Sequence, residues 1–161
     1  MIGDRDKNIL NVLNLETLSN EYMLNRNALF GDIYDDDYNL IQNETLQSNY
    51  KGRYGGLENV KTYIDNVGWE RIDISSNPGR RIYKTGYVES VASTMWLSDT
   101  FFELTGADKQ KLNELEWLQV EQLSDTVIKI TSWPEPFNSA EGEQGRRQIE
   151  LRKILYPNSK D

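Results

Sequence analysis

Thr126-Val-Ile-Lys-Ile-Thr-Ser-Trp133 opens the most regular part of this 161-residue chain. After a loop with proline and glycine, Arg147-Gln-Ile-Glu-Leu-Arg-Lys-Ile-Leu-Tyr156 closes it. Apolar and polar residues alternate in both segments, with Ile128 and Ile130 in the first and Ile149 and Leu151 in the second. A period of two is typical of strands with one buried and one exposed face. We therefore predict an antiparallel β-hairpin over residues 126–156, with these apolar side chains in the core.

Helical spacing dominates the start of the chain. Apolar residues recur at intervals of three and four over residues 7–30, as in an amphipathic helix: Ile9, Val12, Leu13, Leu18 and Tyr22. Between this helical arm and the closing hairpin we expect a flexible loop over 48–56, a short helix over 57–67, a hairpin of 69–74 with 81–88, a helix from 107 to 113 and a strand from 116.

The predicted fold class is α+β. An N-terminal helical arm packs on an antiparallel β-sheet that ends in the C-terminal β-hairpin. The chain forms a single domain over residues 1–161, with the helical arm and an acidic loop over 1–47 and the α+β body over 57–157.

Composition excludes several kinds of function. The chain has no cysteine, so disulfides and cysteine metal sites are excluded. It has no histidine, the commonest general base and zinc ligand, so we expect a protein that is not an enzyme. The net charge of −8 disfavours nucleic acid and suits a basic protein or a cation. No stretch reaches the roughly 18 apolar residues of a membrane span.

A cluster of four carboxylates follows the helical arm: Asp32, Asp35, Asp36 and Asp37. Calcium is the one cofactor that this cluster suggests, because calcium takes several oxygen ligands. The spacing does not fit the EF-hand loop, and a solvated acidic loop or helix start is the alternative.

Residues 90–106 are the most apolar part of the chain and are expected in the core. The alternative is a partner-binding patch of Trp96, Phe101 and Phe102, because large aromatic side chains anchor interfaces. Two arginine pairs, Arg80-Arg81 and Arg146-Arg147, flank predicted strands. They are read either as solvated strand ends that pair with carboxylates or as contacts to an anion or a partner.

The closing segment resembles the end of pilin-like proteins, the type IV minor pilins and type II secretion pseudopilins. The resemblance is carried by Val127–Trp133, the following Pro134 and glycine-rich loop, and Arg146–Leu155. It implies an N-terminal helix packed on an antiparallel sheet, and subunits that assemble through that helix. It also implies an extracellular or cell-surface location, whereas an unrelated chain of this composition would be cytoplasmic.

Three functions are compatible with these features. The first is a non-enzymatic structural or assembly subunit, pilin-like or part of an appendage or virion, that acts through self-assembly or contacts with another protein. The second is an acidic inhibitor or immunity-type protein that masks a basic partner. The third is a carboxylate-based protein that acts on glycans, which needs two acids and aromatic side chains in one cleft.

Overall fold

The computed structural model describes residues 5–26, 28–57 and 60–159, with the side chains of these ranges from Leu15 onward. The elements follow in this order: α1 (Arg5–Arg26), β1 (Phe30–Ile33), α2 (Asp36–Asn43), α3 (Gln47–Tyr54), β2 (Thr62–Ile64), β3 (Glu70–Ile72), β4 (Ile82–Lys84), β5 (Tyr87–Glu89), β6 (Thr94–Ser98), α4 (Asp99–Thr105), α5 (Lys109–Asn113), β7 (Gln119–Ser124), β8 (Val127–Thr131) and α6 (Gly142–Leu155).

A four-stranded antiparallel sheet forms the centre, in the order β1-β6-β8-β7. Side chains alternate between its two faces because successive residues of a strand point to opposite sides. Met95 lies opposite Ile130 and Leu97 lies opposite Ile128, so these four side chains share one face. Trp96 points to the other face.

A helix covers each face of the sheet. On the first face α6 contributes Leu151 and Leu155, which lie in the main core cluster with the four apolar side chains of β6 and β8. On the second face α1 contributes Met23, which packs with Trp96 and Val127 in a smaller cluster. The domain therefore has three layers, of which the α6 layer is the more apolar.

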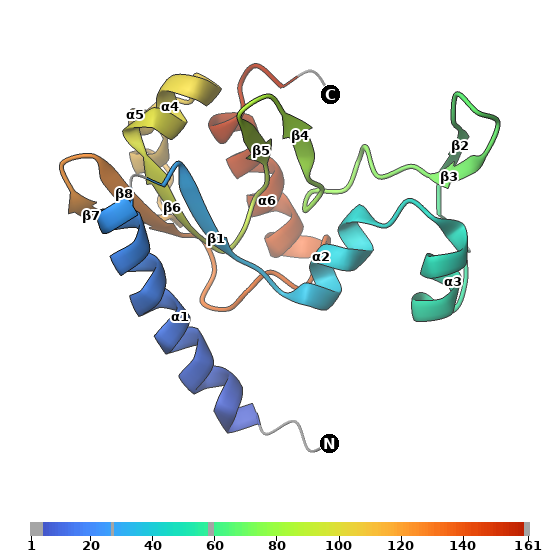
Figure 1. The fold of residues 1–161 in the computed structure, drawn as a ribbon, viewed down its shortest axis with the longest axis horizontal. Helices are drawn as coiled ribbons and strands as arrows, with labels where there is room; N and C mark the ends of the chain where they lie inside the picture. The colour runs from blue at the N-terminus through green and yellow to red at the C-terminus, as the bar shows by residue number, and fades with distance from the viewer. Residues whose placement is uncertain (1–4, 27, 58–59, 160–161) are drawn as a thin grey trace.

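An arm made of α3 and the β2–β3 hairpin projects from this body, at the right of Figure 1. The β2–β3 hairpin pairs with no other strand of the described residues. A third antiparallel pair, β4–β5, lies between the arm and the central sheet along the chain.

The fold class is confirmed, as is the N-terminal helix that packs on an antiparallel sheet. The predicted C-terminal hairpin is wrong. Its first half is β8, but β8 pairs with β7 and β6, and residues 142–155 form α6. The buried positions 148, 151, 152 and 155 repeat at helical spacing, while Ile149 is exposed. Leu151 fits both a strand period of two and a helical spacing, and the structure has the helical one.

Three local predictions between residues 47 and 88 are also wrong. The loop expected over 48–56 is mostly helical, because residues 47–54 form α3. Of the helix expected over 57–67, residues 58 and 59 lie outside the described residues, and residues 62–64 form β2, which pairs with β3. The segments 69–74 and 81–88 do not pair with each other, because β3 takes β2 and β4 takes β5 across a tight turn at Gly86, which has a φ of 92°.

Candidate interaction surfaces

Helix α1 is attached to the sheet mainly through polar contacts. The Glu16 carboxylate lies 2.9 Å from Nζ of Lys129 on β8. The Asn20 side-chain oxygen accepts a hydrogen bond of 2.5 Å from Nε1 of Trp96 on β6. Met23 supplies the apolar part of the contact and is almost fully buried. Residues 16, 20 and 23 lie on one side of a helix, so this side faces the sheet.

Three large apolar side chains lie on the side of α1 that faces solvent, next to exposed polar residues such as Glu21 and Asn25. Leu15 is 49% exposed, Leu18 60% and Tyr22 60%. Their spacing of three and four places them on one face, which we call the α1 stripe. A surface helix normally turns its apolar stripe inward and its polar side outward. The α1 stripe is the reverse of this arrangement.

The β2–β3 hairpin ends in a rigid turn that is organised by Asp65. Its carboxylate accepts hydrogen bonds from the backbone N–H groups of Val67 at 3.0 Å and Trp69 at 2.8 Å, and from Nε of Arg71 at 2.9 Å. The bond from Trp69, followed by the bond from Arg71, lowers the pKa of Asp65. Gly68 has a φ of 86°, a left-handed conformation that glycine adopts without strain.

This turn presents three large apolar side chains to solvent. Ile64 is 66% exposed, Val67 70% and Trp69 62%, and Arg71 lies over the Trp69 ring at 5.1 Å. We call them the arm tip. The tip lies far from the central sheet (Figure 1), so these three side chains do not pack in the core.

The four predicted calcium ligands lie in different elements and have different partners. Asp32 lies on β1, where it accepts a hydrogen bond of 3.1 Å from the Ser90 hydroxyl and lies 3.6 Å from Arg81. Asp35 caps α2 by accepting a hydrogen bond of 2.8 Å from the Tyr38 N–H. Within the described ranges, no group of three or more acidic side chains is arranged to hold a metal ion.

The other two acids occupy the first turn of α2. Asp36 and Asp37 are exposed there, and negative charge is favourable at a helix N-terminus. Asp35, Asp36 and Asp37 therefore form a helix start, the alternative that the sequence left open, while Asp32 belongs to β1.

The proposed aromatic partner patch is not on the surface. Trp96 and Phe101 are fully buried, the first against α1 and the second in the main core. Phe102 is half-buried against the same core. These residues are corrected to core positions: β6 is covered on both faces, and Phe101 makes a tilted ring contact with Phe30 and an edge-on contact with Tyr156.

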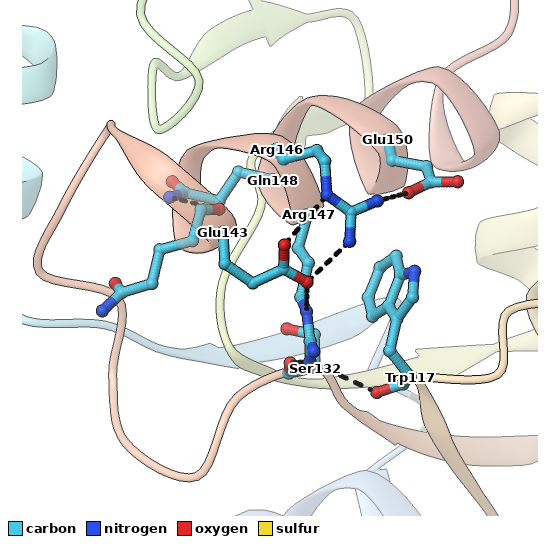
Figure 2. Close-up of polar contacts among 8 residues, drawn as sticks. Trp117, Ser132, Glu143, Arg146, Arg147, Gln148 and Glu150 are labelled. Atoms are coloured by element: carbon cyan, nitrogen blue, oxygen red, sulfur yellow. Dashed lines mark hydrogen bonds and ion pairs between the residues drawn. The ribbon is translucent and has the colours of Figure 1, made fainter.

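Arg147 contacts aromatic rings, a backbone carbonyl and a carboxylate (Figure 2). Its guanidinium lies 4.9 Å from the centre of the Trp117 ring and 5.0 Å from the centre of the Trp133 ring. It donates a hydrogen bond of 2.7 Å to the Ser132 carbonyl and one of 2.8 Å to Glu143. Arg147 thus connects α6 to the end of β8 and the turn before β7.

Arg146 faces solvent on the same helix. It shares Glu143 with Arg147, at 2.6 Å, and reaches Glu150 at 3.4 Å. The two arginines, Arg146 first, hold the pKa of Glu143 at about 2. The second pair is also engaged: Arg81 lies 4.4 Å from the Tyr34 ring, and the Arg80 carbonyl accepts a hydrogen bond from Arg152. Carboxylate pairing therefore holds for Arg146 and Arg147 with Glu143 and for Arg81 with Asp32. Arg80 differs, because it is buried and donates to the Asn77 carbonyl.

A buried charge pair that the sequence did not indicate joins α6 to β5. Glu89 is fully buried, 3.8 Å from Arg152 and 3.4 Å from Nζ of Lys84. The Ser159 hydroxyl donates a hydrogen bond of 2.7 Å to the same carboxylate. No sequence pattern links these four residues, so the ion pair between Glu89 and Arg152 can be identified only from the fold.

Two hollows adjoin Arg81, and each is lined by a single carboxylate. The smaller, of about 20 Å³, has Asp32 beside Tyr38 and Ser90. The larger, of about 420 Å³, is an open groove with Asp73 and Tyr63 on its walls. The Tyr38 pKa is raised to about 12, mainly by burial. Neither hollow pairs two acids in the way that glycoside hydrolysis requires.

Comparison with protein families, with characterised proteins and with solved structures finds no match to this chain. Over the described residues, no helix has both the length and the apolar character needed to cross a membrane. The surfaces themselves must therefore carry any functional argument. The α1 stripe and the arm tip each bring three large apolar side chains into solvent.

Proposed function

We propose that this protein is a non-enzymatic binding subunit that associates with another protein through the α1 stripe. One observation carries the proposal: α1 turns Leu15, Leu18 and Tyr22 to solvent while its polar side contacts the sheet. Anchors at positions i, i+3 and i+7 are the pattern by which one helix lies in the apolar groove of a partner.

The energetics favour burial of this stripe. Complete burial of one large apolar side chain contributes about 1.5–3 kcal/mol. These three side chains are already partly covered, so a partner would gain about 1–2 kcal/mol from each. That gain is large enough to make them the main anchors of an interface.

The non-enzymatic part of the proposal is supported by the engagement of the acids. Asp35 and Asp65 cap backbone N–H groups, while Asp32, Glu89 and Glu143 form ion pairs with basic side chains. The proposal does not depend on the resemblance to pilin-like proteins, because half of the segment that carried it forms α6.

The test compares two leucines of α1. Leu18→Ser removes the centre of the α1 stripe, whereas Leu24→Ser removes an exposed leucine from another side of the helix, where Leu24 is 46% exposed. Each purified variant is used to capture partners from the native source, and its own mass is measured by light scattering. We expect Leu18→Ser to lose the partner, or self-association, that the wild type and Leu24→Ser retain. Equal capture and equal mass for both variants would refute the proposal.

A further inference from the structure

Strand β2 in the arm has one open edge. The backbone N–H of Asp73 donates to the Lys61 carbonyl at 2.8 Å, and the N–H of Asp65 also donates across the hairpin at 2.8 Å. In an antiparallel ladder, residues bonded to the partner strand alternate with residues whose backbone groups point away from it. The N–H and C=O groups of Thr62 and Ile64 therefore point to the side opposite β3.

The outer edge of β3 is covered instead. The N–H of Ile72 points away from β2 and donates at 2.9 Å to the carbonyl of Thr45, in the link between α2 and α3. No other strand of the described residues joins the β2–β3 pair, and all three residues of β2 are exposed. An open strand edge is a template for pairing with another chain, and two strands alone are marginally stable. The arm can thus accept a further strand beside β2.

The sequence of this edge is complementary to itself. In an antiparallel pair of two β2 strands related by a two-fold axis at Tyr63, Thr62 of one copy lies opposite Ile64 of the other. The outward backbone groups of these two residues then form hydrogen-bonded pairs, while Tyr63 meets its own copy where side chains approach most closely. In the same register Lys61 lies opposite Asp65 of the second copy, and opposite charges placed directly across a ladder are favourable.

We propose that β2 pairs with β2 of a second copy of this chain, so that two arms form one four-stranded sheet in the order β3-β2-β2-β3. The proposal goes beyond the proposed function, because it uses the arm and not α1. Each chain carries a net charge of −8, but residues 61–65 hold one lysine and one aspartate and are neutral. The arm also projects from the body, which places this neutral edge away from the central sheet (Figure 1).

The charges select the register more than they strengthen the pair. Asp65 already lies 2.9 Å from Nε of Arg71, so Lys61 of the second copy would approach a carboxylate that has a partner. Charge complementarity of this kind contributes specificity more than affinity. Lys61 lies directly opposite Asp65 only when the two-fold axis is at Tyr63, so this register is favoured over shifted ones.

Single cysteines test the register, because the full chain contains none. The Cα atoms of the two copies of residue 63 would lie about 4.5 Å apart, within the range of a disulfide. Those of residue 64 would lie about 9 Å apart by strand geometry, beyond the limit of about 7 Å. In oxidised glutathione, Tyr63→Cys should form a disulfide-linked dimer at least about ten-fold faster than Ile64→Cys. Exposure alone predicts the opposite order, because Ile64 is 66% exposed and Tyr63 49%.

Sedimentation velocity over a range of concentrations measures the dimer without a crosslink. Tyr63→Lys should raise the dissociation constant at least about five-fold, because it removes the aromatic pair and sets two lysines opposite each other. The control is Tyr83→Lys, the same change at an exposed tyrosine on β4. It should leave the dissociation constant within about two-fold of the wild type, because exposed charges away from the interface are screened by salt.

A second pair of variants tests the backbone bonds. Thr62→Pro removes the outward N–H, and proline is tolerated on an edge strand whose N–H faces solvent. Thr62→Val keeps this N–H, and both variants lose the 2.8 Å hydrogen bond of Thr62 to Glu70. We expect Thr62→Pro to weaken the dimer at least about five-fold more than Thr62→Val, at similar urea midpoints of unfolding.

A wild-type chain that stays monomeric at high concentration would overturn the inference and leave the edge to a strand of a different protein. Equal crosslinking rates at positions 63 and 64, or equal effects of the two lysine variants, would overturn it as well. Leu18→Ser separates this inference from the proposed function. If Leu18→Ser abolishes the dimer and Tyr63→Lys does not, association runs through the α1 stripe, and only the pairing of β2 is refuted.

Discussion

Replacement of Asn20 by alanine tests how α1 is attached to the sheet. The Asn20 oxygen accepts the hydrogen bond of Trp96 Nε1, and the Trp96 side chain is fully buried. Without this acceptor the indole N–H stays buried and unpaired, at a cost of about 1–3 kcal/mol. Alanine also raises helix propensity by about 0.5 kcal/mol, which offsets part of the loss.

Asn25→Ala is the matched control, because it makes the same change on the same helix. The Asn25 amide donates only to the Glu21 carbonyl, in an exposed position. The propensity gain is common to both variants, so the difference between them isolates the contact with Trp96. With a urea m-value of about 2 kcal/mol/M, Asn20→Ala should unfold about 0.5–1.5 M earlier than Asn25→Ala.

Equilibrium unfolding followed by tryptophan fluorescence measures both midpoints. Hydrogen exchange of the α1 amides gives a second readout, because a helix that loses its attachment opens more often. Coincident midpoints and equal protection of α1 in the two variants would show that Asn20 does not hold the helix on the sheet. The orientation of the α1 stripe would then lose its structural basis.

The further predictions concern α6 and the arm. Arg147→Ala should lower stability by about 1–3 kcal/mol in thermal unfolding, because it removes a cation beside the Trp117 ring and its hydrogen bond to the Ser132 carbonyl. Arg147→Lys should restore little of this lost stability. Arg146→Ala, at an exposed position, should stay within about 0.5 kcal/mol of the wild type. The pKa of Glu143 is depressed to about 2 from an ordinary 4.5, so the stabilisation by its ion pairs is complete above about pH 4.5 and is lost as pH falls toward 2. Glu143→Gln should therefore flatten the dependence of stability on pH between about pH 4.5 and 2. An unchanged slope in the variant would contradict the assignment of this pKa. Trp69→Ala should leave the unfolding midpoint nearly unchanged yet remove much of the emission that acrylamide quenches, whereas a large loss of stability would place the arm tip in the core.

The sequence predicts the helical arm, β8 and the fold class, but not α6. The reason lies in which positions α6 buries. Gln148 is fully buried because its amide accepts from the Tyr38 hydroxyl at 2.9 Å and donates to the Ser139 carbonyl. Arg152 is buried beside Glu89. Polar residues on the inner face conceal the helical period, and their partners are as far as 110 residues away in sequence.

The orientation of α1 is hidden in the same way. The spacing of Leu18 and Tyr22 predicts a helix and suggests that this side packs inward. Glu16 and Asn20 face the sheet instead, because they meet Lys129 and Trp96, which lie 113 and 76 residues further along the chain. Apolar periodicity identifies the α1 stripe but not its direction, because the residues that contact the polar side of α1 lie far away in the sequence.

Attachment and binding therefore use different sides of one helix, and this makes the proposed function separable from the fold. Residues 16, 20 and 23 contact the sheet, so changes there lower stability. Leu18 and Tyr22 are mostly exposed, so polar replacements there should change the free energy of unfolding by about 0.5 kcal/mol or less. If Leu18→Ser abolishes association at unchanged stability, the loss belongs to the interface. If it unfolds the protein, the stripe is part of the domain itself, and the reversed polarity of α1 would need another explanation.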